Sequence, residues 1–240
     1  MNTTRSLMPN KTFGKVPARE NYGAILFQED FLSPSQISEA VAWANELGKE
    51  RRAVHQTGKY AHLRWFECDV KPDWPIAAKL LDELGAQNPE LMLFYYLEPG
   101  AKIHPHRDLS GAALSNRIRF HVPIITNPEV FFMVNNQRVI MNPGELWCLD
   151  TSYLHSVANE GSEYRVHMVV ECDINKNLKS RLPNNFQTKL HTASFIFIMS
   201  SLFVKSLFIN SFRDPRYLWS QIMMIVRYVG WRFLGIGTPR

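Results

Sequence analysis

Short hydrophobic runs separated by turn residues dominate the middle of the chain. Between residues 91 and 173 the runs are rich in β-branched and aromatic residues, and turns such as EPG, TNPE, VNNQ and NPGE separate them. The runs are LMLFYYLEPG, KIHPH, RIRFHVPII, VFFMVN, QRVIM, LWCLD, HSVAN and YRVHMVVECD. Many short strands at this spacing predict a mainly β protein with a sandwich or jelly-roll core.

The residues before this region predict both strands and helices. The apolar run AILF (24–27) and the segment HLRWFECDV (62–70) favour strands. SPSQISEAVAWANELGKE (33–50) has apolar residues at helical spacing, and either Ser33 or Ser35 can cap this predicted helix. WPIAAKLLDELG (74–85) predicts a second helix that ends at its final glycine. Residues 1–22 form a lead-in without a clear pattern.

The C-terminal residues follow a different pattern. After a polar, turn-rich stretch (174–189), the segments 191–212 and 217–237 are helical or strongly apolar in pattern. The first segment contains ASFIFIMSSLFV, twelve residues without a charge, which is shorter than the roughly 20 that span a bilayer. The second mixes arginine with tryptophan and tyrosine, as in helices that lie at a membrane surface. Three interpretations stay open: helices packed on the β-core or in a dimer contact, helices at a membrane surface, and a spanning helix.

The pattern therefore divides the chain into three parts. Residues 1–22 are the lead-in, 23–174 a jelly-roll domain with N-terminal helices, and 175–240 a linker followed by a basic, apolar helical segment. The formal net charge is +5. From Lys176 to Arg240 there are ten lysines and arginines against one acid, whereas the first 175 residues carry 17 basic and 21 acidic residues. The basic excess thus belongs to the tail, where anionic lipid, an acidic partner or solvent could face it.

Composition also bears on the compartment and on partners. The three cysteines are scattered and form no CxxC motif, which fits a reducing cytosol. The first residues, MNTTRSLMPNKTFGK, lack the apolar core of a signal peptide. We expect a cytoplasmic protein, with peripheral membrane contact through 190–237 as an option. The β-region has no basic, aromatic platform for nucleic acid, and the sequence does not indicate an oligomeric state.

Candidate chemistry begins in the stretch IHPHRD (103–108). His104, His106 and Asp108 follow one another at a period of two, so a strand places them on one face. A histidine and a carboxylate, joined by a distant second histidine, form the facial triad that holds non-haem Fe(II) and leaves coordination positions open. The local pattern does not decide between the two histidines.

Two later motifs extend this site. DTSYLH (150–155) brings His155 to the end of an apolar strand, after a Pro-Gly turn. YRVHMVVECD (164–173) places Arg165 on the next strand, ten residues beyond that histidine. An arginine there is suited to binding the carboxylate of a co-substrate.

The region 93–173 resembles the aspartyl/asparaginyl β-hydroxylase family of Fe(II)- and 2-oxoglutarate-dependent oxygenases. The resemblance runs through EPGAKIHPH, RIRFH, PGELWCLDTSYLHSVAN and YRVHMVVECD. It implies a double-stranded β-helix, the cupin-like form of the jelly roll. It makes His106 and His155 the iron-binding histidines with Asp108 as the carboxylate ligand, and it leaves His104 as a pocket residue.

The resemblance also implies a co-substrate site. Arg165 would bind the distal carboxylate of 2-oxoglutarate, with His121 and Arg119 nearby. Three residues would support the turn before the second histidine, namely Asp150, Thr151 and Ser152. Family members that hydroxylate free proline carry His-x-Asp, as this chain does, and other members act on lipid acyl chains.

The implied function is a hydroxylase that consumes O2 and 2-oxoglutarate and releases succinate and CO2. Its substrate would be an amino acid, a peptide or a lipid-linked molecule. One alternative is a metal-dependent jelly-roll enzyme of another class, such as a hydrolase or isomerase. The other is a non-catalytic, membrane-associated binding module. Arg165 separates the first two, because a metal hydrolase does not need an arginine one strand beyond its last ligand.

Overall fold

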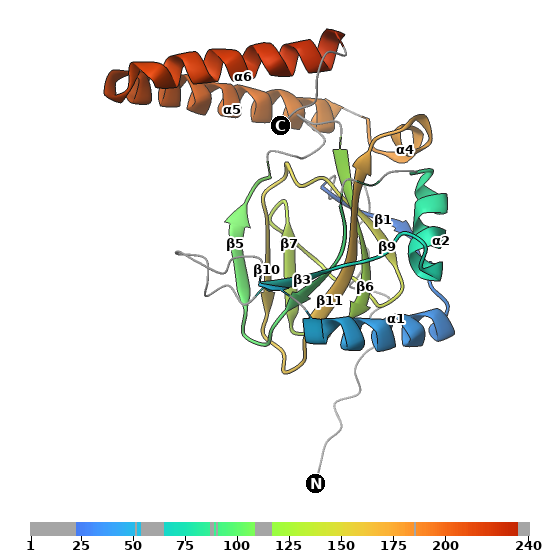
Figure 1. Cartoon of the computed structure of the whole chain (residues 1–240). Helices are drawn as coiled ribbons and strands as arrows, with labels where there is room; N and C mark the ends of the chain where they lie inside the picture. Colours follow the sequence, from blue (N-terminus) through green and yellow to red (C-terminus); the bar gives the residue numbers. More distant parts are fainter. Residues whose placement is uncertain are drawn as a thin grey trace. The chain divides into compact units, whose positions relative to one another are not determined.

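The computed structural model describes residues 23–50, 52–53, 65–86, 89, 91–108, 117–184 and 186–234. The chain divides into two compact units, Met1–Asn185 and Phe186–Arg240. The predicted lead-in 1–22 lies outside the described residues. Figure 1 shows the strands and the helices α1, α2 and α4 of the first unit, and the helices α5 and α6 of the second.

Two antiparallel sheets form the first unit. The larger sheet has seven strands in the order β1-β9-β6-β11-β4-β3-β2, and the smaller has four in the order β5-β10-β7-β8. The strands are β1 (Ala24–Gln28), β2 (Arg52–Ala53), β3 (Trp65–Asp69), β4 (Leu91–Leu97), β5 (Lys102–His106), β6 (Arg117–Ile125), β7 (Val130–Val134), β8 (Gln137–Val139), β9 (Leu146–Leu149), β10 (His155–Asn159) and β11 (Arg165–Asp173). Two antiparallel sheets with flanking helices confirm the predicted mainly β, jelly-roll class.

Helices cover the outer face of the larger sheet. They are α1 (Pro34–Leu47), the 3-10 turn η2 (Gly48–Glu50) and α2 (Pro75–Leu84). Ser33 caps α1 in a capping box, and Gly85 ends α2 in the left-handed conformation at φ 60°. The sequence predicted Gly85 as the end of α2, and it left Ser33 and Ser35 as alternative caps of α1. Figure 1 shows α1 in blue and α2 in teal beside the larger sheet.

Two hydrophobic clusters hold these layers together. One joins the helices to the outer face of the larger sheet through residues such as Leu80, Phe120 and Met168. The other lies between the two sheets and includes Trp147 of β9 and Val157 of β10. Strand β11 is buried along nearly its whole length because it lies between these clusters. Its even-numbered residues face the helices, which leaves its odd-numbered ones for the space between the sheets.

The stretch predicted as a linker contains a short helix, α4 (Lys176–Arg181). Asn175 caps it by accepting a hydrogen bond from the backbone of Leu178, at 2.9 Å, and its amide donates to the Leu84 carbonyl at 2.7 Å. Leu178 is fully buried in the cluster that holds the helices on the sheet. Polar composition therefore concealed a helix that belongs to the first unit.

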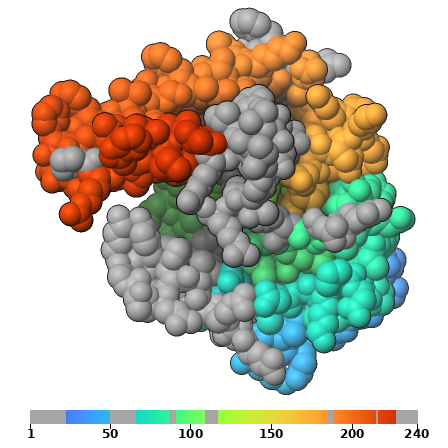
Figure 2. Space-filling view, turned by 45° about the horizontal axis from the view of Figure 1, so that its top comes forward, coloured from blue at the N-terminus to red at the C-terminus, as the bar shows by residue number. Residues whose placement is uncertain are grey.

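The second unit is a pair of helices, α5 (Phe186–Arg213) and α6 (Pro215–Leu234). Ser206 and Tyr217 share a hydrogen bond of 3.0 Å between their hydroxyl groups, which joins the two helices. Within α5, residues Thr188–Arg213 are long and apolar enough to cross a membrane, and 6% of the apolar window is buried. Counting only the twelve uncharged residues gave too short an apolar helix, because the helix continues through Lys205. Figure 2 shows this pair in orange to red.

Candidate metal and co-substrate site

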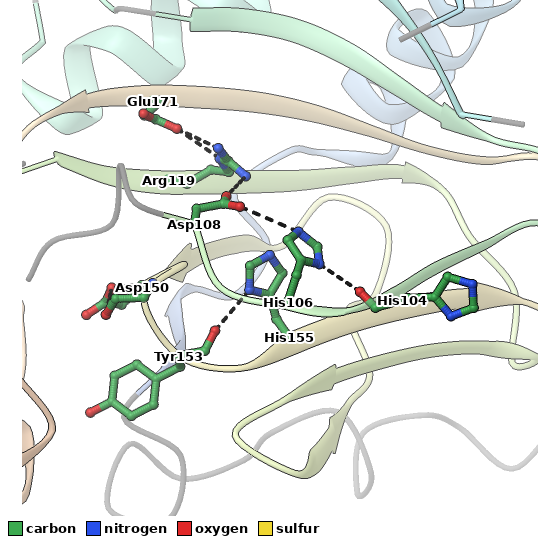
Figure 3. Close-up of polar contacts among 9 residues, drawn as sticks. His104, His106, Asp108, Arg119, Asp150, Tyr153, His155 and Glu171 are labelled. Carbon is green, nitrogen blue, oxygen red and sulfur yellow. Dashed lines mark hydrogen bonds and ion pairs between the residues drawn. The ribbon is translucent and has the colours of Figure 1, made fainter. Parts of the chain in front are cut away.

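Three predicted metal ligands meet where β5 and β10 lie side by side. His106 ends β5, Asp108 follows it, and His155 begins β10. The two histidines are directly paired in the strand register, and their ring centroids are 4.2 Å apart. One ligand atom from each of the three residues lies within 4.8 Å of the others. Sequence positions 49 residues apart thus form a single candidate site (Figure 3).

Backbone carbonyls fix both histidine rings. Nδ1 of His106 donates to the carbonyl of His104 at 2.7 Å, and Nδ1 of His155 donates to that of Tyr153 at 3.0 Å. Because a carbonyl can only accept, these bonds put the proton on Nδ1 and leave Nε2 free to bind a metal. Burial lowers the pKa of His155, which favours the neutral form that a metal needs.

His104 does not belong to the group of ligand atoms. Its ring is exposed and lies further along β5 (Figure 3), and the residue does not line the cavity that the three ligands share. The expectation that it is a pocket residue was therefore wrong. Its contribution is the backbone carbonyl that orients His106.

The turn before His155 is built as the resemblance implied. Oδ1 of Asp150 accepts hydrogen bonds from the backbone N–H of Ser152, at 3.0 Å, and from its hydroxyl, at 2.7 Å. The carbonyl of Thr151 accepts from the backbone N–H of Asp108, at 2.9 Å. This last bond ties the carboxylate ligand to the turn that carries the second histidine.

A cavity of about 540 Å³ opens beside the three ligands. It lies between the two sheets, and its polar residues include Arg165, His121 and Arg119. Apolar side chains from both sheets complete it, namely Leu97, Ile103, Phe132, Leu149 and Val157. The structure thus brings every predicted metal and co-substrate residue to one cavity.

Arg165 is a buried cation at this cavity. Its side chain is 3% exposed, and it makes no salt bridge to a carboxylate among the described residues. Nη2 donates to Nδ1 of His167 at 2.8 Å, and the guanidinium lies 5.4 Å from the ring centroid of Phe132. Nε has no hydrogen-bond partner in the part of the chain that the structure describes. Burial lowers the pKa of Arg165 to about 9. An uncompensated buried cation is costly, so the arrangement suits an anion that arrives from outside the chain.

Two buried histidines extend from that arginine. His121 and His167 lie with their Nδ1 atoms 3.2 Å apart. Burial, and then the positive charge of Arg165, lower the pKa values of both histidines well below their usual range. Both rings are therefore neutral at pH 7, and the positive charge at this end of the cavity belongs to Arg165.

Arg119 lines the same cavity and is bound by two carboxylates. Its Nη1 donates to Oδ2 of Asp108 at 3.0 Å, while Nε and Nη2 both donate to Oε2 of Glu171, at 3.0 and 2.7 Å. Burial opposes its charge, but Glu171 and Asp108 raise its pKa above the ordinary value. Arg119 is thus a permanent cation bound to two carboxylates.

Sequence reasoning missed Glu171 and His167. Both lie on β11 at odd-numbered positions, with Arg165, and alternate with apolar residues. Period-two polar residues inside an otherwise hydrophobic strand are a detectable sign of a polar inner face. Because both faces of the strand are buried, the polar residues are mixed with valines and the alternation is weak in the sequence.

Comparison with known proteins identifies the domain. Residues 61–174 match the family model described as Aspartyl/Asparaginyl beta-hydroxylase. This region is similar to the aspartyl/asparaginyl β-hydroxylase family. The match confirms the predicted family and its enzyme class, the 2-oxoglutarate-dependent oxygenases, with Fe(II), 2-oxoglutarate and O2 as cofactor and co-substrates. A search of curated proteins found no match.

Solved structures are similar to this chain in fold. One is the epimerase SnoN from nogalamycin biosynthesis in complex with Fe3+, alpha ketoglutarate and nogalamycin RO, at 15% identity over 65% of this chain and 80% of that chain, with a TM-score of 0.50. Another is HygX from Streptomyces hygroscopicus with nickel and 2-oxoglutarate, at 9% identity over 62% and 82%, with a TM-score of 0.49. A third is the viral collagen prolyl hydroxylase vCPH from Paramecium Bursaria Chlorella virus-1, at 15% identity over 60% and 93%, with a TM-score of 0.44.

Proposed function

We propose that this protein hydroxylates an unactivated C–H bond, with His106, Asp108 and His155 holding Fe(II) and Arg165 binding 2-oxoglutarate. One observation carries the proposal: a buried arginine without a carboxylate partner among the described residues lines the same cavity as a His-Asp-His ligand set. Two neutral imidazoles and one carboxylate leave coordination positions open for a co-substrate.

Each side chain has a defined task. The hydrogen bonds to backbone carbonyls hold the Nε2 atoms of His106 and His155 toward one point. Arg165 offers a planar donor group to the distal carboxylate of 2-oxoglutarate, and the neutral histidines beside it do not compete for that anion. Iron and 2-oxoglutarate, when bound, supply the oxidising chemistry that turns O2, 2-oxoglutarate and a C–H bond into succinate, CO2 and an alcohol.

The cavity fits a small reacting group. Its volume of about 540 Å³ holds the co-substrate and part of a substrate, and Phe132, Leu97 and Val157 limit the access of water. These dimensions suit an amino acid, a peptide side chain or one end of a lipid-linked molecule. A metal enzyme of another class has no use for Arg165, which favours the oxygenase.

Succinate formation tests the ligand set. His155→Ala should abolish substrate-dependent succinate formation, because two ligands hold Fe(II) poorly. His104→Ala is the matched control, since its ring lies outside the cavity while its backbone carbonyl is retained. It should keep activity within about twofold. Full activity in His155→Ala would refute the iron assignment.

For the second unit we propose peripheral contact of the cytoplasmic protein with an anionic membrane surface. Apolar side chains such as Phe208 (68% exposed), Phe212 (78%) and Trp219 (68%) are open along both helices. Soluble proteins rarely expose so much contiguous apolar surface. Lys205 and Arg213 lie among these residues, and basic side chains beside exposed aromatics suit the headgroup region.

Vesicle flotation tests this contact. The full chain should float with vesicles of phosphatidylcholine and phosphatidylglycerol, and Phe208→Asp/Phe212→Asp should abolish flotation. Phe131→Asp is the control, because Phe131 is also exposed, at 40%, but lies on β7 of the first unit. Release of the wild type by high salt would agree with surface contact, whereas retention at alkaline pH would indicate a spanning helix. A wild-type chain that does not float but dimerises would overturn the proposal in favour of a contact between copies.

A further inference from the structure

The carboxylate of Asp108 has its two oxygens directed to different partners. Oδ1 lies 3.5 Å from Nε2 of His106, on the side where the ligand atoms converge. Oδ2 accepts a hydrogen bond from Nη1 of Arg119, at 3.0 Å (Figure 3). Arg119 therefore fixes the rotation of the carboxylate and leaves one oxygen for a metal.

Glu171 in turn fixes Arg119. The two residues face each other directly in the antiparallel register of β6 and β11. Two donors of Arg119 bind the same oxygen of Glu171, at 3.0 and 2.7 Å, and the side chain of Glu171 is 8% exposed. A carboxylate this buried is costly unless it is paired, so the pair constrains the arginine far more than a surface contact would.

The charges give Glu171 a second effect. Arg119 alone would neutralise Asp108 and repel a divalent cation at the neighbouring ligand atoms. Together Arg119, Asp108 and Glu171 carry one net negative charge. If Glu171 is replaced by a neutral residue, the group carries no net charge. Because the pair is buried, water screens these charges only weakly.

We propose that Glu171 is a positioning residue for the metal site and acts on Asp108 through Arg119. It holds the guanidinium in the place that turns one oxygen of Asp108 toward the metal, and it offsets the positive charge beside that metal. Arg119 then serves the metal ligand and not the co-substrate. The inference rests on the proposed His-Asp-His site.

Binding of Mn(II) to the purified full chain, followed by the electron paramagnetic resonance of the free ion, tests this role without turnover. Glu171→Gln should weaken Mn(II) binding about tenfold, as expected when a group that orients a ligand is lost. The affinity of the Mn(II)-saturated variant for 2-oxoglutarate should stay within about twofold of the wild-type value. A general structural defect would weaken both.

A double-mutant cycle identifies the route of the effect. In an Arg119→Met background, Glu171→Gln should change Mn(II) affinity by less than about threefold, because the connecting residue is gone. Glu145→Gln is the matched control. Glu145 is a buried carboxylate that accepts hydrogen bonds from Asn142 and Trp147 and does not line the cavity, so its loss should lower stability but not Mn(II) affinity.

The outcomes separate this inference from the proposed function. A wild-type chain that does not bind Mn(II) refutes the metal site itself. A wild-type chain that binds, with equal affinity in Glu171→Gln, refutes only the role of Glu171, as does an equal loss in both backgrounds. If Glu171→Gln does not fold, Glu171→Asp keeps the charge and should retain Mn(II) affinity within about threefold. A tenfold loss in that folded variant would contradict the charge argument.

Discussion

Arg165→Met should make the protein more stable without ligands and unable to bind 2-oxoglutarate. Arg165 is buried, and no carboxylate among the described residues pairs with it. Methionine has a similar length and no charge, so it can fill the space without the desolvation cost. The substitution therefore separates the effect of Arg165 on folding stability from its effect on 2-oxoglutarate binding.

The structure sets the size of this effect. Burial lowers the pKa of Arg165 to about 9, and this fall corresponds to roughly 5 kcal/mol against the charged form. The variant loses the hydrogen bond to His167 and the contact with the ring of Phe132, each worth about 1 kcal/mol. The expected net gain in the free energy of unfolding is about 3 kcal/mol.

Urea unfolding at pH 7.5, followed by near-ultraviolet circular dichroism, measures this difference. The order of stability should reverse with Mn(II) and 2-oxoglutarate, because 2-oxoglutarate at about 1,000 times its Kd adds about 4.1 kcal/mol to the wild type alone. An unliganded variant that is no more stable than the wild type would refute the argument that Arg165 is an uncompensated charge. Equal stabilisation of both proteins by 2-oxoglutarate would remove Arg165 from the co-substrate site.

Three further predictions follow from single residues. Arg165→Lys should raise the KM for 2-oxoglutarate at least about tenfold, because an ammonium group cannot form the paired hydrogen bonds of a guanidinium; an unchanged KM in a steady-state assay would contradict this. Burial depresses the pKa of His167, so below pH 6.5 the unfolded chain binds more protons than the folded chain, and stability falls as the pH drops. His167→Asn should reduce the loss of unfolding free energy between pH 7.5 and 5.5 by about 1 kcal/mol in urea unfolding. An identical loss in the variant would show that His167 does not contribute. Gly144 has φ +81°, and a Cβ there would lie 2.7 Å from Ile37, so Gly144→Ala should lower the free energy of unfolding by about 2–3 kcal/mol. In Gly85→Ala the nearest atom to the new Cβ lies at 3.4 Å, so the loss should be about 1 kcal/mol. Equal losses in urea unfolding would refute the steric argument.

Local patterns predicted much of the fold. Helix caps act within a few residues: Gly85 ends α2 as predicted, and of the two candidate serines the structure uses Ser33 to cap α1. The strands were visible because turn residues separate them. Helix α4 was not visible, since the burial of Leu178 depends on distant residues of the first unit.

The choice between His104 and His106 as metal ligand also needed more than the local sequence pattern. His104 and His106 are equivalent by period, and the resemblance to a family selected His106. The structure supplies the physical reason: the register of β5 and β10 sets His106 directly against His155, while His104 contributes only its carbonyl. A register between strands 49 residues apart cannot be read from either strand alone.

The sequence by itself determined the kind of chemistry, because residue types and their spacing limit which metal and which co-substrate a site can hold. Together with the family resemblance, these patterns pointed to His106, Asp108, His155 and Arg165. Only the tertiary structure decided how these residues are supported. The partnership of Arg119 with Glu171 and Asp108 exists because β6 and β11 are neighbours and the residues that follow β5 approach them. Hydrogen bonds between separate strands depend on distances that folding alone sets.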